Sequence, residues 1–388
     1  MFSKRVSFNL QENNLTLLLT RKRRSGTEII DLTESNPTLV GLEYPEKDVL
    51  AKLPRSESLV YSPMARGEEV CRNSISDYYS ERGVAVCAKD ILLTSSTSEA
   101  YSFLFKLLID PGDQILIPRP SYPLFGFLAQ LECARTTTYP LCYQNGWYYD
   151  LDTLERCFSS ATKAVVLVNP NNPTGTYIEQ GQWRRLRELC LHHGTALICD
   201  EVFVDYCFSQ TSRPFDPLSE TGLLSFFLNG LSKTAGLPQM KLSWIVIRGP
   251  SEQKRSASEH LEVVADTFLS VNSLVQKATP GFMKMARDIR EQILHRIRVN
   301  YGFLSKVSAG TAVECLSAQG GWYATLRVPG IKSEEEWALH LLEATNTLVH
   351  PGYFYDYEGK AFLVVSLLPE FAVFEEGVQR ILGEISAN

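Results

Sequence analysis

The chain has 388 residues, of which 44% are hydrophobic and 21% charged, and its formal net charge is −6. This length exceeds one ordinary hydrophobic core, so we expect two domains, and the composition is that of a soluble globular protein. The negative charge gives no reason to expect a nucleic-acid partner, and no apolar run is long enough to span a bilayer.

The cysteines bear on metal binding and on location. There are nine, and no two of them have Cys-x-x-Cys spacing. The sequence therefore predicts neither a metal site nor a disulfide framework. Because free thiols persist in a reducing compartment, and the N-terminus lacks the apolar segment of a signal peptide, we expect a cytoplasmic protein.

The N-terminal part is predicted to be mainly helical. Residues 8–24 have a helical repeat of apolar side chains and end in four basic residues, which suit the dipole at the end of a helix. A short apolar strand over 29–32 is followed by the turn-forming sequence Glu34-Ser35-Asn36-Pro37. Further on, Tyr61 precedes a predicted helix over 68–82.

Four predicted strands end in polar or turn-forming residues. The pairs of strand and turn are 91–94 with Ser95-Ser96-Thr97-Ser98, 114–117 with Pro118-Arg119-Pro120-Ser121-Tyr122-Pro123, 164–168 with Asn169-Pro170-Asn171-Asn172-Pro173-Thr174-Gly175, and 195–199 with Asp200-Glu201. The first turn opens a helix, whose free N–H groups and hydroxyls favour a bound phosphate; a plain N-cap is the alternative. The carboxyl ends of buried strands are where open α/β sheets bind ligands.

A fifth buried strand delivers a lysine. The apolar run 223–228 is followed by Gly230-Leu231-Ser232-Lys233 on a short turn. Burial disfavours the ammonium form, so we expect a lowered pKa for Lys233. A neutral amine attacks a carbonyl carbon, which makes Lys233 a candidate nucleophile. The alternation of strands and helices up to this point predicts an α/β sandwich with a mostly parallel sheet.

After Lys233 the predicted pattern changes to α+β. We expect a strand over 242–247, a helix over 250–270 and a long helix over 273–308 with a kink or break at Pro280-Gly281. Short strands then alternate with helices up to the C-terminus. No repeat, low-complexity tract or flexible linker separates these segments.

These motifs, in this order, resemble the class I/II aminotransferases, which are fold type I enzymes dependent on pyridoxal 5′-phosphate. The resemblance implies that Lys233 forms a Schiff base with the cofactor and acts as general acid and base. The other implied cofactor contacts are Ser96 and Thr97 at the phosphate, Tyr122 stacked on the pyridine ring, Asn172 at its 3′-oxygen, Asp200 at its nitrogen, and Ser232 beside the lysine. Tyr61 matches a residue that reaches the phosphate of the neighbouring subunit, which implies a homodimer.

The resemblance covers nearly the whole chain and implies two domains. A large α/β/α domain with a mostly parallel sheet would comprise residues 49–277 and bind the cofactor. A smaller α+β domain would combine residues 1–48 and 278–388. Asn36 would lie at the mouth of the site, where it is a candidate substrate contact.

The chain departs from the family at several positions. Lys241 stands where an arginine clamps the phosphate, and Phe203 replaces a tyrosine that bonds the 3′-oxygen. Val364 occupies the position of the arginine that grips the substrate carboxylate, which suits a substrate with an aliphatic or ring portion there. Arg327 is the best local substitute, because strand alternation puts it on one face with Tyr323; a surface arginine is the alternative.

Three functions stay open at this point. The first is transamination of a specialised amino acid or amine, and the second is another reaction on the same cofactor, such as elimination, replacement, cyclisation or decarboxylation. The third is a non-catalytic ligand sensor, but Lys233 and Asp200 are present and nothing before Tyr61 resembles a helix-turn-helix. We therefore expect an enzyme with a small-molecule amino substrate, and transamination first.

Overall fold

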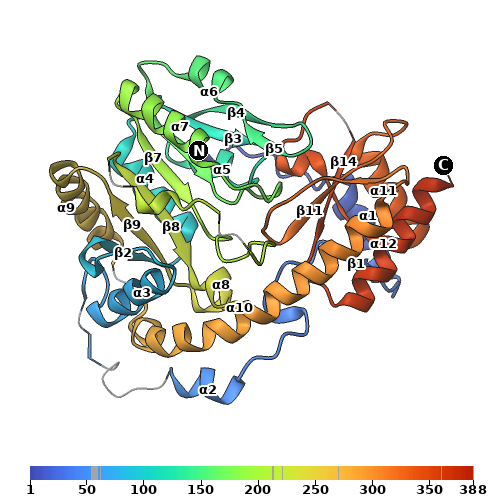
Figure 1. Ribbon diagram of the computed structural model, residues 1–388, viewed down its shortest axis with the longest axis horizontal. Coiled ribbons are helices and arrows are strands. Elements are labelled where there is room, and N and C mark those ends of the chain that lie inside the picture. The colour runs from blue at the N-terminus through green and yellow to red at the C-terminus, as the bar shows by residue number, and fades with distance from the viewer. Residues whose placement is uncertain are drawn as a thin grey trace.

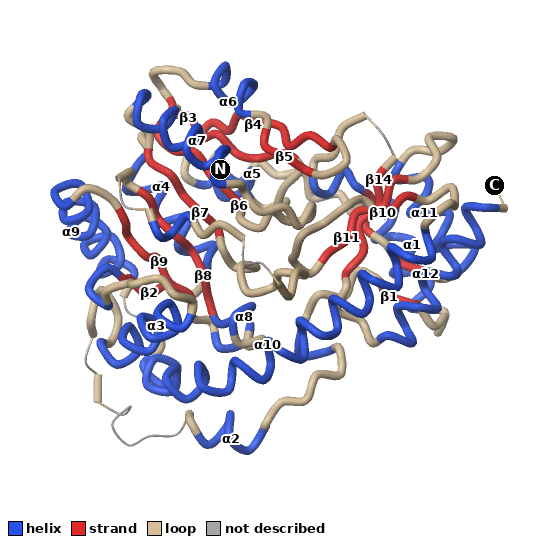
Figure 2. The backbone as a smooth tube through the Cα atoms, viewed as in Figure 1, coloured by secondary structure: helices blue, strands red, loops and turns tan. Residues whose placement is uncertain are grey.

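The structure is a computed structural model that describes residues 1–53, 60–61, 63–211, 214–220, 222–269, 271–359 and 361–387. An eight-stranded sheet and a four-stranded sheet lie beside each other, each with its own helices (Figures 1 and 2). The long helix α10 (Ser273–Ser308) runs from one part to the other and packs against helices of both.

The large sheet has the strand order β2-β9-β8-β7-β6-β3-β4-β5. The consecutive neighbours from β8 to β4 are parallel, whereas β9 and β5 are antiparallel to the strands beside them. The bounds are β2 (Ile91–Thr94), β3 (Gln114–Arg119), β4 (Arg135–Tyr143), β5 (Trp147–Tyr149), β6 (Thr162–Val168), β7 (Ala196–Asp200), β8 (Ser225–Gly230) and β9 (Ser243–Arg248). The predicted, mostly parallel α/β sheet is confirmed.

Helices cover both faces of this sheet. In β6, Val165 and Leu167 belong to one core, and Ala164 and Val166 belong to the other. Because strand side chains alternate between faces, a strand buried on both sides is a continuous apolar run. One face carries α4 (Thr97–Leu108), α5 (Phe125–Leu131) and α9 (Ser251–Phe268), and the other carries α3 (Glu69–Glu81), α6 (Leu151–Cys157), α7 (Gln180–His193) and the start of α10.

The second part is α+β, as predicted. Its antiparallel sheet has the order β10-β11-β14-β13, and a short parallel pair joins β1 to β12. Trp322, Trp337 and Phe374 are fully buried in its core. The elements are β1 (Ile30–Asp31), β10 (Glu314–Cys315), β11 (Tyr323–Arg327), β12 (Thr347–Leu348), β13 (His350–Pro351), β14 (Phe362–Ser366), α1 (Asn14–Arg24), α11 (Glu334–Thr345) and α12 (Phe371–Ser386). A short helix, α2 (Glu46–Ala51), lies beside α10 (Figure 1).

Two helices differ in extent from the prediction. Helix α1 begins later than residue 8 because the side chain of Asn13 caps it, accepting a hydrogen bond from the Thr16 N–H at 2.8 Å. Helix α10 does not break at Pro280. Ala278 and Phe282 on either side of the proline are fully buried in the core of the large sheet, and this packing keeps the helix continuous.

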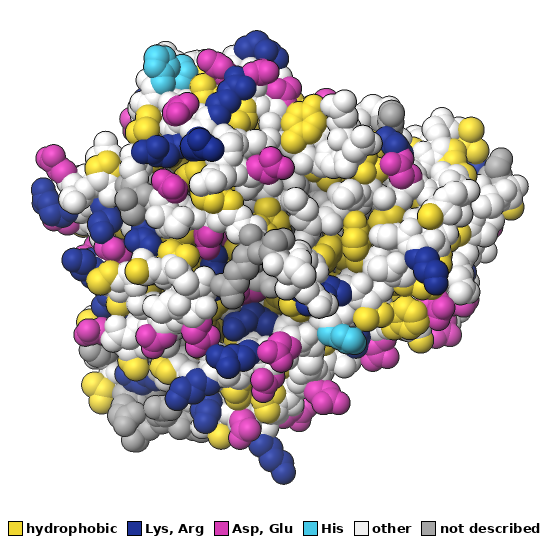
Figure 3. Space-filling model, viewed as in Figure 1, with side chains coloured by type: hydrophobic (Ala, Val, Ile, Leu, Met, Phe, Trp, Pro, Cys, Tyr) yellow, Lys and Arg dark blue, Asp and Glu magenta, His cyan; other side chains and the backbone are white. Residues whose placement is uncertain are grey.

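The face of the molecule seen in Figure 3 is mixed in charge. On the face drawn in Figure 3, basic and acidic side chains are interspersed, and no block of one sign stands out. Within the described residues, no helix is both long enough and apolar enough to cross a bilayer. We propose that the chain divides into a large domain of residues 49–277 and a small domain of residues 1–48 and 278–388.

Candidate active site

A cavity of about 200 Å³ lies at the carboxyl ends of β6, β7 and β8. Its lining is Ser35, Thr97, Tyr122, Val168, Asn172, Asp200, Val202, Phe203, Gly230, Ser232, Lys233, Ser243 and Tyr323. Most of the predicted cofactor contacts are therefore brought together at one place. Tyr323 is the first residue of β11, so the cavity also borders the smaller sheet. Ser35, from the N-terminal part of the chain, lines the same cavity.

Lys233 reaches this cavity from α8 (Leu231–Thr234), a single helical turn directly after β8. Its Nζ atom lies 4.3 Å from the ring centre of Trp322 and 5.4 Å from that of Phe203. Burial lowers the pKa of Lys233 from 10.5 to about 8, and the nearby Asp200 carboxylate opposes this shift. The predicted lowering of the Lys233 pKa is confirmed, and a useful fraction of the amine is neutral near pH 8.

The backbone of the lysine turn is held by side chains from elsewhere. A one-turn helix leaves carbonyl groups without partners inside the helix. The Tyr206 hydroxyl donates to the Lys233 carbonyl, Arg290 donates to the Thr234 carbonyl at 3.1 Å, and the Tyr44 hydroxyl donates to the Gly236 carbonyl at 2.7 Å. These three anchors come from separate segments and fix the position from which Lys233 extends.

Asp200 ends β7 with both carboxylate oxygens engaged. Its Oδ1 accepts a hydrogen bond from the Val202 N–H at 3.1 Å, and its Oδ2 accepts one from the Tyr101 hydroxyl at 3.1 Å. Burial raises the pKa of Asp200 to about 6, against the opposing effects of these donors and of Lys233. The group is therefore mostly ionised at pH 7 and can accept a further hydrogen bond from a cationic ring nitrogen.

The N-terminus of α4 provides an anion-binding end. The Ser96 hydroxyl caps the helix by accepting from the Glu99 N–H at 3.1 Å, and Thr97 lines the cavity. The first-turn N–H groups and the helix dipole both favour a negatively charged ligand there. Ser96 itself lies outside the lining, so its contribution is to shape the turn.

Asn172 and Tyr122 complete the polar wall. Asn172 is 8% exposed, and its Oδ1 has no hydrogen-bond partner within the described structure. A buried amide without a partner is costly, which indicates that a ligand group bonds it. Tyr122 packs edge-on against Phe125, with ring centres 6.0 Å apart, and presents its ring to the cavity.

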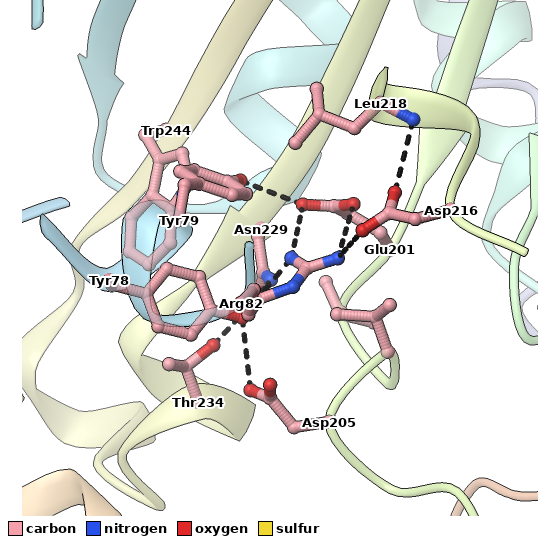
Figure 4. A network of polar contacts seen from close by, with 12 residues as sticks. Tyr78, Tyr79, Arg82, Glu201, Asp205, Asp216, Leu218, Asn229, Thr234 and Trp244 are labelled. Carbon is pink, nitrogen blue, oxygen red and sulfur yellow. Dashed lines mark hydrogen bonds and ion pairs between the residues drawn. The ribbon is translucent and has the colours of Figure 1, made fainter. Parts of the chain in front are cut away.

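A buried ionic network surrounds Glu201, the residue that follows Asp200 in the chain (Figure 4). Glu201 accepts hydrogen bonds from Arg82 at 3.2 Å and from the Tyr79 hydroxyl at 2.7 Å, and Arg82 also pairs with Asp216 at 2.7 Å. This network ties the end of β7 to α3. Glu201 is engaged in this network and does not line the cavity, whereas Asp200 is the acidic residue among the described side chains that do.

Comparison with known proteins agrees with this geometry. The family model described as aminotransferase class I and II matches residues 27–380. The chain belongs to this family. A glutamate-pyruvate aminotransferase of Haemophilus influenzae is 24% identical over 93% of this chain and 91% of that protein, and an alanine aminotransferase of Mycobacterium bovis is 27% identical over 93% and 86%.

Solved structures share the fold of this aminotransferase. The alanine aminotransferase of Pyrococcus furiosus superimposes with a TM-score of 0.91 at 22% identity, covering 100% of both chains. The aspartate aminotransferase of Thermotoga maritima does so with a TM-score of 0.85 at 19% identity, covering 99% of each. The predicted fold type I architecture is confirmed, and the alternative reactions on the same cofactor are not favoured.

Enzymes of this family depend on pyridoxal 5′-phosphate, and the cavity residues fit that cofactor. The helix end at Thr97 suits a phosphate, and the amide N–H groups of Asn172, which lines the cavity, can donate to a ring oxygen. The Asp200 carboxylate suits a protonated ring nitrogen, and the lowered pKa of Lys233 suits reaction with an aldehyde.

Other predicted residues of the aminotransferase lie outside the cavity lining. Lys241 is exposed and has a left-handed backbone with φ of 50°. Asn36 uses its side-chain oxygen to accept from the Thr38 N–H at 3.0 Å, while its neighbour Ser35 lines the cavity. Tyr61 is 78% exposed and does not contribute to the cavity of its own chain.

The structure corrects the expectation that Arg327 or Val364 contacts the substrate. Arg327 lies four residues beyond Tyr323, about 13 Å along the strand, and it pairs with Glu314 in a separate pocket. Val364 is fully buried against Tyr355 and other apolar side chains and does not line the cavity. Neither residue is therefore placed to contact a substrate at Lys233, and an aliphatic substrate portion against Val364 is excluded by this packing.

Several lining residues were not singled out from the sequence. Val168 lies in register with Asp200 across β6 and β7, so strand pairing puts both at one sheet edge. Ser35 adjoins the predicted Asn36, and Tyr323 begins the strand that contains Arg327. Tyr101 does not line the cavity but contacts Asp200; it is one helical turn after Thr97 on α4, and this i to i+4 spacing is the signal that could have identified it.

Proposed function

We propose that Lys233 is the residue of this aminotransferase that binds the cofactor and moves the proton at the substrate's α-carbon. The observation that carries the proposal is the meeting of Lys233, Asp200 and Asn172 in one cavity. When bound, the cofactor supplies a ring that withdraws electrons from the α-carbon. The residues that would hold it are Thr97 and Ser232 at the phosphate, in a turn that Ser96 shapes, Tyr122 on the ring face, and Asn172, Asp200 and Phe203 around the ring edge.

The proposed substrate is a specialised amine or modified amino acid. Among the residues lining the cavity there is no arginine, and the outer polar groups are the hydroxyls of Ser35, Tyr122 and Tyr323. A hydroxyl that donates to a carboxylate makes one hydrogen bond to a charged group, whereas an arginine makes two parallel ones and also supplies the opposite charge. A plain α-carboxylate is therefore bound less firmly here than by an arginine fork.

A second candidate is transamination between alanine and glutamate with their keto acids. It is supported by the names of relatives that are 24% and 27% identical to this chain. The two candidates differ in how well a short, unmodified amino acid is used.

Steady-state kinetics separate these candidates. We expect kcat/KM for alanine or aspartate with 2-oxoglutarate to fall below about 10⁴ M⁻¹s⁻¹, and a panel of amines and modified amino acids to contain a better donor. The ratio between alanine and ethylamine reports how much the carboxylate contributes. A value of about 10⁴ M⁻¹s⁻¹ or more with alanine would reject the specialised substrate and favour the second candidate.

We also propose a homodimer located in the cytoplasm. Tyr61 and its neighbour Val60 are exposed by 78% and 67%, which supports a role for this segment at a second subunit. All nine cysteines are free thiols, which supports a reducing location. Fractionation of cells that produce the protein, with enzyme recovered only outside the soluble fraction, would contradict the location.

A further inference from the structure

Tyr101 occupies a position that links the two ends of the cavity. It lies on α4, four residues after Thr97, so both side chains are on the same helix face. Thr97 faces the cavity at the helix N-terminus, and Tyr101 reaches the carboxylate of Asp200 one turn deeper. One helix thus contacts the place suited to the phosphate and the carboxylate suited to the ring nitrogen.

The Tyr101 hydroxyl is committed to this contact. The side chain is 2% exposed, and its hydroxyl donates to Asp200 Oδ2 at 3.1 Å. The other carboxylate oxygen is held by the Val202 N–H at 3.1 Å. Each oxygen therefore has one donor from the protein and retains a lone pair directed elsewhere, which is available to a ligand.

We propose that Tyr101 is a positioning residue: its hydroxyl fixes Asp200 Oδ2 and keeps this carboxyl ionised, so that the carboxylate accepts a hydrogen bond from the protonated ring nitrogen of the cofactor. The proposal rests on the role proposed for Asp200. A hydrogen bond to the ionised form favours that form, whereas burial disfavours it. Loss of the hydroxyl would let the carboxyl compete with the ring nitrogen for the shared proton.

Three other titratable side chains lie near Asp200. Lys233 approaches from α8 and favours the ionised carboxyl, and Tyr122 approaches from the segment after β3. Cys199 precedes Asp200 in β7 with a raised pKa, so it stays neutral. Among these groups, Tyr101 is the donor whose removal changes no charge and leaves Lys233 in place.

The ring of Tyr101 has a separate packing role that phenylalanine would keep. It packs edge-on against Phe125 with ring centres 5.2 Å apart, and Phe125 in turn packs against Tyr122. Tyr101→Phe therefore removes only the hydroxyl. Tyr139→Phe is a matched control, because Tyr139 is also buried, donates to the Val166 carbonyl at 2.7 Å and does not line the cavity.

The test uses holoenzyme prepared with pyridoxal 5′-phosphate labelled with ¹⁵N in its ring. In Tyr101→Phe, we expect the ring ¹⁵N signal to move toward that of the unprotonated nitrogen at pH 7, and the acidic limb of the kcat profile to move up by about one pH unit. KM is expected to stay within about twofold, because Tyr101 does not line the cavity. Thermal unfolding alongside Tyr139→Phe checks that folding is retained.

The variant Asp200→Asn separates the role proposed for Tyr101 from the role proposed for Asp200. If Asp200→Asn moves the ¹⁵N signal but Tyr101→Phe leaves both the signal and the pH profile as in the wild type, the role of Tyr101 is rejected. If Asp200→Asn itself leaves the ¹⁵N signal unchanged, the role proposed for Asp200 fails first. A shift in Tyr139→Phe equal to that in Tyr101→Phe would show a general packing effect and would also reject the inference.

Discussion

At the scale of single residues, Phe203 distinguishes this site from that of relatives with tyrosine there. Phe203 is 4% exposed, lines the cavity and packs edge-on against Trp322. Tyr206 lies three residues further along the chain, but its hydroxyl donates to the Lys233 carbonyl. Phe203 therefore offers no hydroxyl to a ring oxygen of the cofactor, and the nearest phenol in the described lining that packs against it is Tyr323, with ring centres 6.3 Å apart.

The substitution Phe203→Tyr tests this difference. A phenol that donates to the anionic ring oxygen stabilises that anion, so the adjacent nitrogen joining Lys233 to the cofactor holds its proton less firmly. We expect the pKa of that nitrogen to fall by about one unit in Phe203→Tyr, as measured by spectrophotometric pH titration. An unchanged titration, or a wild-type enzyme already unprotonated well below neutral pH, would contradict the account.

At the scale of elements, the sequence predicted features that depend on short segments. Each buried strand is a continuous apolar run followed by a turn, so Asn172, Asp200 and Lys233 could be located from local pattern alone. The continuity of α10 could not be predicted in this way, because the packing of the buried neighbours of Pro280 outweighs the helix-breaking effect of the proline. Strand alternation correctly predicts a face for Arg327 but not its distance from the cavity, which depends on how the two sheets are placed.

At the scale of the whole molecule, the site borders both sheets, and this could not be read from periodicity. Ser35 and Tyr323 are 288 positions apart in the numbering and meet at one cavity. The lysine turn is likewise anchored by Tyr44 and Arg290, which are far from it in the chain. The resemblance to a family placed only the neighbouring Asn36 at the mouth of the site, because the chain's local patterns do not specify which distant segments meet.

The proposed homodimer belongs to the same scale. If Tyr61 acts at the partner's phosphate, Tyr61→Phe should weaken binding of the cofactor by about tenfold while leaving a dimer by light scattering. The matched control is Tyr148→Phe, since Tyr148 is also exposed and does not line the cavity. A wild-type holoenzyme that is fully active as a monomer would rule this proposal out.

The most direct measurement concerns Lys233, on which the whole account depends. Holoenzyme reduced with borohydride and digested should carry the cofactor on the peptide that contains Lys233, as identified by mass spectrometry. Lys233→Ala should lack the linked cofactor's absorption band and lose about 10²-fold to 10⁴-fold in turnover, whereas Lys163→Ala, at an exposed lysine of β6, should match the wild type. A label on another lysine, together with turnover retained in Lys233→Ala, would contradict the account.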